Sequence, residues 1–352
     1  MATKTNPGNY FENFELGQKI VHATPHTVTV GDASLYTALY GMRFATHSSD
    51  AFAQAIGYPQ APIDDFLVFH VVCGKTVPDV SLNAIANLGY AQGKFGAPVF
   101  PGDSLSTVSE VIGLKENSNG KTGTVYVRSV GTNQRGETVL DYVRWVMVRK
   151  GDTSAPTPDP VVPDLAAKVA DADLVVPDGL TLAGYDTVLA GSPHLWDDYE
   201  AGEKIDHVDA MTVEEADHMT ATRLYQNTAK VHFNQHTEKD GRFGKRIVYG
   251  GHVISLARSF AFNGLANSFR VAAINGGRHV APIFAGDTVY AWTEVVEKIT
   301  LDGRDDIGAL RLRMIAAKDR ACADFPDKGE DGKYDPAVVL DFDYTVLMPR
   351  RF

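Results

Sequence analysis

The sequence predicts an α+β protein made of two copies of one unit, each a long buried helix wrapped by an antiparallel β-sheet. Three observations support this prediction. The chain contains an internal repeat, each copy holds one long apolar segment, and each copy ends in runs where β-branched and aromatic residues alternate with polar ones. A chain of 352 residues has room for two domains.

The repeat is clearest in residues 95–111 (FGAPVFPGDSLSTVSEV) and 279–295 (HVAPIFAGDTVYAWTEV). Aligned without a gap at an offset of 184 residues, these stretches are identical at seven of seventeen positions. Two further pairs of stretches match: 12–20 with 197–205 at an offset of 185, and 139–150 with 339–350 at an offset of 200. We therefore expect a duplicated unit of roughly 150 residues.

A proline-rich stretch, TSAPTPDPVVPDLAAKVADADLVVP, separates the two copies. We predict an N-terminal unit at residues 1–150, a Pro-rich linker at 151–190 and a C-terminal unit at 191–352. Because clustered prolines favour extended backbone, we expect the linker to lie along the surface.

The long apolar segments are residues 64–77 (DDFLVFHVVCGKTV) and 250–267 (GGHVISLARSFAFNGLAN). Apolar side chains occur on nearly every side of each predicted helix, which is typical of a helix buried all round. We expect one such helix at the centre of each unit.

The alternating runs predict the sheet. Residues 121–150 read as an antiparallel meander around the turn NQRG, and residues 308–320 and 338–348 repeat it. The polar insertion 324–337 in the second copy is predicted to be a surface loop. Because an unpaired sheet edge is unfavourable, the two units are expected to pair edge to edge into one sheet.

Composition narrows the possible partners. A net charge of −11 argues against nucleic acid or an anionic membrane as the main partner. No apolar run reaches the ~18 residues of a membrane span, and no secretory signal is visible, so we expect a cytoplasmic protein. Cys73 and Cys322 have no metal-ligand spacing and are expected to be structural thiols. No ligand cluster or Gly-rich dinucleotide motif implies a metal or a cofactor.

Particular motifs carry a resemblance to a known family. The entry YFENFELGQKI, the turn APVFPGDS or APIFAGDT, and a His that follows a Thr-Val pair in each half resemble the MaoC-like, or hydratase 2, branch of the hotdog fold. More narrowly, residues 41–72 and the stretch LYQNTAKVHFN resemble the mesaconyl-CoA hydratase family. The resemblance implies a tandem (double) hotdog. It also implies reversible hydration of a CoA thioester, 2-methylfumaryl-CoA (mesaconyl-C1-CoA), to β-methylmalyl-CoA.

That resemblance also implies a pair of catalytic residues. The family's pattern is an Asp followed five residues later by a His, and the two share the acid/base work. The second half keeps His232 but holds Asn227 at the Asp position, and the first half keeps His47 but holds Met42. Neither half therefore carries the complete pair.

The helix starts distinguish the halves. In this fold the free backbone N–H groups at the start of the buried helix face the thioester carbonyl. The second half places Gly250 and Gly251 there, which lets a substrate approach the backbone closely. We expect the principal site in this half, with His232 as acid/base, Asn227 orienting the water or the carbonyl, and the Gly251 N–H as oxyanion donor.

The first half places carboxylates at the equivalent point. Asp64 and Asp65 could cap the helix and consume its donors, or repel an enolate. Asp50 and Asp65 could also supply the carboxylate that both pairs lack, with His47 beside them. Asp103 and Asp287 follow Gly in a tight turn and are expected to be structural.

Basic residues are candidates for binding the substrate. We expect one of four residues to hold the distal carboxylate of the dicarboxylyl group: Arg43, Arg223, Lys230 or Arg278. The segment GRFGKR offers three residues for the CoA phosphates: Arg242, Lys245 and Arg246. Fused hotdogs often pair again, so a homodimer is expected.

Two other functions stay open at this point. An acyl-CoA thioesterase on the same fold would use a carboxylate, Asp50 or Asp65, to activate water against the thioester carbon. A non-catalytic acyl-CoA binding protein is compatible with the missing Asp in both halves. Fold alone does not choose among these functions.

Overall fold

Eleven strands form one antiparallel sheet in the computed structural model, which describes residues 4–351. Their order is β1-β4-β5-β6-β3-β8-β11-β10-β9-β7, with the short strand β2 paired to β4. In the first half they span β1 Lys19–Val21, β2 His26–Thr27, β3 Ala84–Phe95, β4 Ser104–Glu116, β5 Thr122–Thr132 and β6 Thr138–Arg149. In the second half they span β7 Lys204–Thr212, β8 Arg270–His279, β9 Thr288–Leu301, β10 Arg304–Lys318 and β11 Val338–Pro349.

The two halves meet at strands β3 and β8. These strands pair antiparallel, with Tyr90 opposite Gly277 and Lys94 opposite Ala273. On either side of this junction the strand order is mirrored, as a duplicated unit requires. The predicted edge-to-edge pairing is therefore confirmed, and it removes one exposed edge from each half.

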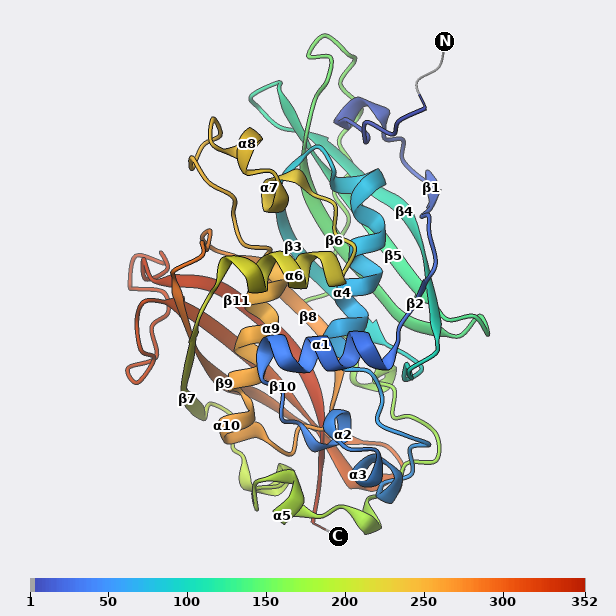
Figure 1. Ribbon diagram of the computed structural model, residues 1–352, viewed down its shortest axis with the longest axis vertical. Coiled ribbons are helices and arrows are strands. Elements are labelled where there is room, and N and C mark those ends of the chain that lie inside the picture. The colour runs from blue at the N-terminus through green and yellow to red at the C-terminus, as the bar shows by residue number, and fades with distance from the viewer. Residues whose placement is uncertain (1–3, 352) are drawn as a thin grey trace.

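The central helices α4 (Asp65–Thr76) and α9 (Gly250–Phe260) lie side by side on one face of the sheet (Figure 1). Every residue of α4 is buried, as its apolar sequence predicts. The second predicted helix, 250–267, is too long. Helix α9 ends at Phe260, and a short helix α10 (Phe262–Leu265) follows it. The backbone inside α10 is non-helical at Asn263 and at Gly264, whose φ of 112° favours glycine.

The other described helices are short or lie outside this central pair. The α-helices are α1 (Val30–Tyr40), α2 (Ala45–Ser48), α3 (Asp50–Ala55), α5 (Thr187–Ala190), α6 (Glu215–Leu224), α7 (Lys230–Phe233) and α8 (Gln235–Glu238). The η segments are η1 (Phe11–Asn13), η2 (Val77–Ser81), η3 (Asp171–Asp173), η4 (Leu182–Gly184) and η5 (Trp196–Asp198). Helices α1 and α6 cover the central pair (Figure 1). None of the described helices has the length and apolar character needed to cross a membrane.

A pseudo-twofold axis passes between the central helices. The Tyr40 and Tyr225 hydroxyls are 2.6 Å apart, and His70 Nε2 is 2.9 Å from Ser255 Oγ. Each pair joins residues that are 185 positions apart and therefore equivalent in the two copies. Two hydrogen bonds on this axis thus join each residue to its own repeat.

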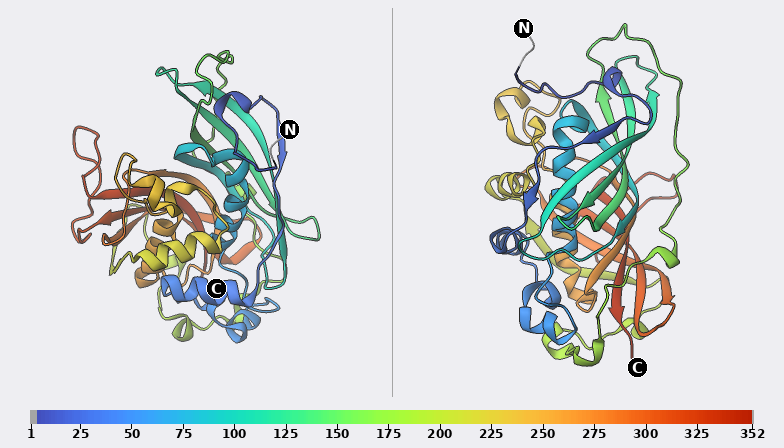
Figure 2. Two further views of the ribbon diagram at one scale, coloured as in Figure 1. Left: turned by 45° about the horizontal axis from the view of Figure 1, so that its top comes forward. Right: turned by 90° about the vertical axis from the view of Figure 1, so that its right-hand side faces the viewer.

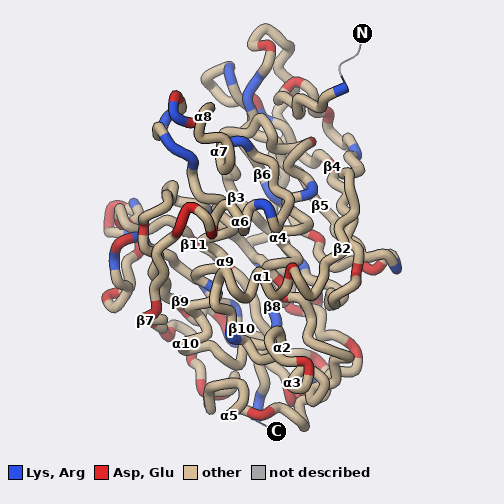
Figure 3. The backbone as a smooth tube through the Cα atoms, in the orientation of Figure 1, with Lys and Arg blue, Asp and Glu red and all other residues tan. Residues whose placement is uncertain are grey.

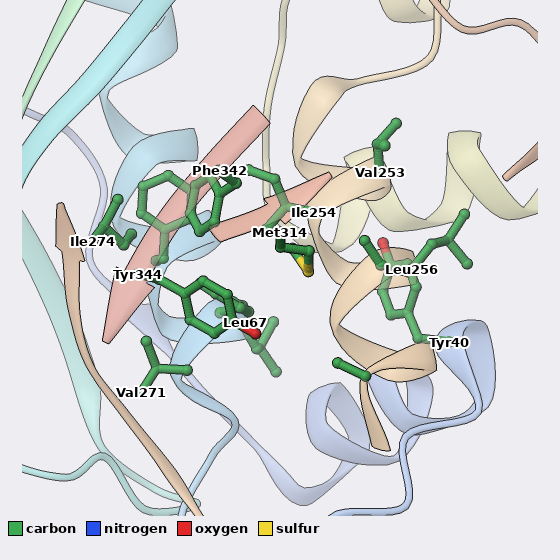
Figure 4. Close-up of a cluster of buried hydrophobic side chains, with 14 of the residues drawn as sticks. Tyr40, Leu67, Val253, Ile254, Leu256, Val271, Ile274, Met314, Phe342 and Tyr344 are labelled. Carbon is green, nitrogen blue, oxygen red and sulfur yellow. The ribbon is translucent and has the colours of Figure 1, made fainter. Parts of the chain in front are cut away.

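An apolar core fills the space between the helices and the sheet (Figure 4). Leu67 of α4, Ile254 and Leu256 of α9, and Phe342 and Tyr344 of β11 belong to one buried cluster. All five side chains are fully buried. A core shared by both halves holds the two central helices in a definite relative position.

The segment between β6 and β7 runs along the sheet face opposite the helices (Figure 2). Val161 forms a β-bridge with Leu114, and Leu180 and Leu182 join a buried cluster with Phe52. The linker lies on the surface, as expected. Its limits at 151–190 stay a prediction, as do the units 1–150 and 191–352, whose outermost residues 1–3 and 352 lie outside the described part.

The repeated Gly-Asp turns have the same geometry in both halves. Asp103 Oδ2 accepts a hydrogen bond from the Phe100 N–H at 2.9 Å, and Asp287 Oδ2 accepts one from the Phe284 N–H at 3.0 Å. The carboxylates close the turns. Both aspartates therefore have the structural role that the sequence predicted.

Candidate active site

His232 and His47 occupy equivalent positions on the short helices α7 and α2. His232 Nδ1 lies 2.9 Å from the Ile247 carbonyl oxygen, and His47 Nδ1 lies 3.1 Å from the Pro62 carbonyl oxygen. A carbonyl only accepts, so each Nδ1 carries the hydrogen and each Nε2 keeps its lone pair. Both imidazoles are therefore held as oriented proton acceptors.

The two central helices begin differently. In α4, Asp64 Oδ1 accepts a hydrogen bond from the Phe66 N–H at 2.9 Å. In α9 no side chain caps the first turn. Phe66 and Gly251 are equivalent, since they lie 185 residues apart. The donor that faces the site in the second half is thus consumed by a carboxylate in the first.

Aromatic and imidazole rings surround the start of α9. A Cβ at Gly250 would lie 2.3 Å from His279 Cε1. At Gly251 it would lie 2.3 Å from Tyr249 Cε1 and 2.6 Å from His70 Cε1. Any side chain at either glycine would therefore displace a ring. The glycine pair is required by this close packing as well as by access to the backbone.

Sequence reasoning missed three of these rings. His279 ends strand β8, and its Nε2 lies 3.2 Å from the hydroxyl of Tyr90 on β3. His70 comes from α4 and Tyr249 from the residue just before α9. The Gly-Gly pair was the signal that something packs closely there. The sequence offered no local pattern that joins residues from four separate elements.

Burial keeps these imidazoles neutral. It lowers the pKa of His232 to about 4, and the hydrogen bond to Ile247 opposes this only in part. Burial also lowers the pKa of His279 to about 4, with a smaller contribution from His232. The charge of one ring therefore affects the pKa of the other. Near pH 7, His232 Nε2 is therefore free to accept a proton.

The side chain of Asn227 points toward the backbone of its own loop. Its Oδ1 accepts a hydrogen bond from the Ala229 N–H at 2.9 Å, and the side chain is buried. This contact shapes the loop that leads into α7. The Nδ2 group is the part of Asn227 left to orient a ligand.

The first-half candidates gather at the start of α4. Asp65 is buried, and its Oδ2 accepts a hydrogen bond from the Val271 N–H at 2.8 Å. Burial raises the pKa of Asp65, while nearby Arg270 and His47 oppose this rise. Asp50 is exposed, and its Oδ1 accepts a hydrogen bond from the Ala61 N–H at 2.9 Å. Asp65 therefore shares a site with His47, whereas Asp50 closes a loop.

The four candidate carboxylate clamps lie at the surface. Arg43 pairs with Asp209 at 3.3 Å, and Arg223 donates to residues of its own helix. Lys230 is exposed. Arg278 is exposed on β8, next in sequence to His279, and neighbouring residues of a strand point to opposite faces. These positions give no support to a clamp in the second-half site.

The basic segment after α8 is an exposed loop, and its Lys and Arg positions are blue in Figure 3. Arg242 lies over the Phe243 ring at 5.1 Å, and Lys245 lies over the Phe284 ring at 4.2 Å. The two rings are 5.5 Å apart. Arg246 instead forms an ion pair with the carboxylate of Glu215 on α6. Two cations and two rings thus remain available beside the loop.

The described residues contain no group of three or more His, Cys, Asp or Glu side chains that could hold a metal ion. Two surface hollows lie away from the candidate residues, one at the 320–336 loop and one at the end of α5. Neither hollow is lined by a residue of the histidine sites.

The fold and the duplicated histidine sites define a MaoC-like double hotdog protein. The chain matches the crystal structure of a MaoC domain protein dehydratase from Chloroflexus aurantiacus with a TM-score of 0.98 and 67% identity, over 100% of both chains. A protein of Mycobacterium tuberculosis described as a double hotdog matches with a TM-score of 0.77 and 26% identity, over 97% of this chain and 99% of that one.

More particularly, this chain belongs to the mesaconyl-CoA hydratase family, whose model matches residues 1–325. It is 67% identical to β-methylmalyl-CoA dehydratase of Chloroflexus aurantiacus over 351 residues, covering 100% of both proteins. It is 59% identical to mesaconyl-CoA hydratase of Cereibacter sphaeroides over 348 residues, covering 99% of this chain and 100% of the relative.

Proposed function

We propose that this protein is a hydro-lyase that reversibly adds water to 2-methylfumaryl-CoA (mesaconyl-C1-CoA) to give β-methylmalyl-CoA. The names of both relatives support this reaction in its two directions. The water oxygen bonds to C3, which bears the distal carboxylate, and a proton bonds to C2, which bears the methyl group. The C2–C3 double bond becomes a single bond, and no oxidant or reductant is needed.

His232 acts as the acid/base group in this proposal. Its Nε2 takes a proton from water as the oxygen attacks C3, and the double-bond electrons move toward the thioester oxygen. The imidazolium then returns the proton to C2, which restores the neutral ring. Since one imidazole handles both transfers, H and OH add to the same face of the double bond.

The Gly251 N–H stabilises the thioester oxygen as negative charge develops on it. The observation that favours the second half is the contrast with Phe66, the equivalent residue in the first half. The Phe66 N–H is bonded to Asp64, whereas no side chain caps the start of α9. A carboxylate beside the first helix would also repel the enolate. We therefore propose that the first half shapes the acyl pocket.

The polar ends of the substrate require further contacts. We assign the distal carboxylate to His279 and Tyr90, because these groups reach the start of α9 from the junction of the halves. We assign the nucleotide end of CoA to the loop after α8. Arg242 and Lys245 would bind phosphates there, and Phe243 and Phe284 offer faces on which the adenine could stack.

We also propose a homodimer in the cytoplasm. Pairing of the two halves buries one sheet edge of each. The outer edges β1 and β7 and the outer faces stay available to a second copy. The net charge of −11 is consistent with this location, because it disfavours binding to nucleic acid and to anionic membranes. Size-exclusion chromatography with light scattering measures the assembly directly.

The test is a spectrophotometric assay with mesaconyl-CoA that follows the loss of enoyl-thioester absorbance and, in parallel, thiol release with a thiol reagent. His232→Ala and His47→Ala form a matched pair, because each removes the same imidazole-to-carbonyl hydrogen bond. We expect absorbance loss without thiol release, abolished by His232→Ala and kept by His47→Ala.

Other outcomes would assign another function. Stoichiometric thiol release would identify a thioesterase, which would implicate the buried carboxylate of Asp65. Absence of both signals, with mesaconyl-CoA still bound in a calorimetric titration, would identify a binding protein. Loss of hydration in His47→Ala alone would move the catalytic site to the first half.

A further inference from the structure

His70 differs from the histidines that only support the fold. Its side chain is fully buried, and its Nδ1 has no hydrogen-bond partner among the described residues. His207, which is equally buried, has both nitrogens bonded, to Asn263 O at 2.8 Å and Thr293 Oγ1 at 2.7 Å. A buried polar atom without a partner is costly, so the unbonded nitrogen of His70 indicates a ligand.

The unbonded nitrogen faces the candidate active site. The Cε1–Nδ1 edge of the His70 ring lies against Gly251, since a Cβ there would be 2.6 Å from Cε1 and 2.7 Å from Nδ1. Two other histidine nitrogens are also buried without a hydrogen-bond partner among the described residues: Nδ1 of His218 and Nε2 of His26. Neither of those rings is among the nearest neighbours of Gly251.

Hydrogen bonds at Ser255 bear on which His70 nitrogen carries the hydrogen. The Tyr36 hydroxyl donates to Ser255 Oγ at 2.8 Å, and Ser255 Oγ lies 2.9 Å from His70 Nε2. A hydroxyl that accepts from Tyr36 can give its one hydrogen to Nε2. When Ser255 donates to Nε2, the hydrogen of the neutral ring is on Nδ1.

From this arrangement we propose that the Nδ1–H of His70 is a second oxyanion donor, which binds the thioester oxygen of the enoyl-CoA beside the Gly251 N–H. Helix α4 of the first half thereby completes the catalytic site of the second half. The inference rests on the proposed function of that site, and Ser255 is its positioning residue.

A neutral imidazole suits this role. Burial lowers the pKa of His70 to about 3, with smaller contributions from His252 and His279. The ring therefore stays neutral at pH 7 and offers an N–H without the cost of a buried charge. Neutral imidazole donors polarise substrate carbonyls in this way in other enzymes.

The kinetic test compares two substitutions of one side chain. His70→Leu removes the donor, and we expect kcat for mesaconyl-CoA hydration to fall on the order of 10²–10³-fold with little change in KM. The amide nitrogen of His70→Asn falls near the position of Nδ1, so this variant should keep kcat within about tenfold of the wild type. Equal losses in both variants would contradict the proposal.

The spectroscopic test does not depend on turnover. Methylsuccinyl-CoA labelled with ¹³C at the thioester carbonyl has no double bond to hydrate. Wild-type protein should lower its carbonyl stretching frequency, because two donors polarise the C=O bond. His70→Leu should lower it less, and Ser255→Ala, which frees Nε2 to take the hydrogen, should fall between. An identical frequency in all three proteins would overturn the proposal.

Two controls separate the possible failures. His207→Leu removes a buried imidazole with both nitrogens bonded. It should lower stability but leave kcat and the carbonyl frequency unchanged. If His232→Ala abolishes hydration and His70→Leu leaves kcat unchanged, the proposed function stands and His70 is a core residue. If neither substitution affects hydration and His47→Ala does, the proposed site itself is wrong. If His70→Leu fails to fold, His70→Asn and Ser255→Ala still carry the spectroscopic test.

Discussion

His232 holds its Nδ1 against the Ile247 carbonyl oxygen at 2.9 Å, directly before the start of α9. The same contact recurs between His47 and Pro62 at 3.1 Å, so duplication preserved the geometry of the imidazole in both halves. The surroundings of the two histidines differ. In the second half, the helix start is uncapped and a group of neutral rings lies beside it.

The pH dependence of hydration should follow His232. Burial lowers its pKa to about 4, and only the neutral ring can accept a proton from water. We expect kcat/KM for mesaconyl-CoA to stay level between pH 6 and 8 and to fall at lower pH, with an acid limb near that value, because kcat/KM reports the free enzyme. Brief exposure followed by assay at pH 7 controls for unfolding. An acid limb centred near pH 6.5 would indicate a solvated imidazole instead.

Gly251→Ala should strongly lower the hydration activity and leave the protein folded. The added Cβ would lie 2.3 Å from Tyr249 Cε1, so the ring or the helix start must move away from the oxyanion position. We expect kcat to fall on the order of 10²-fold, the scale of losing one oxyanion donor. Gly31→Ala is the control, because it lies in helix α1 with only Thr29 Oγ1 at 3.4 Å. That change should leave kcat unaltered, and equal loss in both variants would contradict the assignment.

The loop after α8 should recognise the nucleotide end of CoA. Replacing both Arg242 and Lys245 by Ala removes two exposed cations, and we expect KM for mesaconyl-CoA to rise about tenfold while kcat is kept. Mesaconyl-pantetheine, which lacks the nucleotide, should show no such change. The wild-type KM for the CoA ester should also rise with salt. A similar change in KM for both thioesters would place the phosphates elsewhere.

The protein should lose stability as the pH falls from 7 to 5. Burial lowers the pKa of five histidines to about 3 or about 4: His70, His207, His232, His252 and His279. In the unfolded chain they titrate near 6.5, so below that pH the unfolded state binds more protons. The contribution to stability is complete above pH 6.5 and is lost progressively as the pH falls toward the folded-state values.

Urea unfolding at several pH values measures this effect. The midpoint should decrease between pH 7 and pH 5, where few carboxylates titrate. His207→Leu should reduce the slope of the unfolding free energy against pH by about one proton. A midpoint that stays constant over this range would show that these histidines are accessible to protons in the folded state.

Much of the fold was predictable from the sequence because it depends on periodicity and repetition. The duplicated turns with Asp103 and Asp287, the two buried helices and the strand meanders all follow from local patterns. The repeat implied that the units pair edge to edge, and the structure shows this pairing between β3 and β8. The length of the second helix was not predictable from apolarity. Helix α9 ends at Phe260, although the next residues, Ala261 and Phe262, are apolar.

The sequence by itself determined the family, the paired histidines His47 and His232, and the unequal helix starts, since each of these depends on residues close together in the chain. Only the tertiary structure decided which groups meet at Gly251. His70 is 181 residues away in the chain, yet its ring lies against that glycine. Contacts of this kind arise from packing two central helices on a shared sheet, and the packing leaves no periodic signal in the sequence. The structure also showed that Asn227 bonds to the Ala229 N–H of its own loop and that Arg43 and Arg223 are exposed.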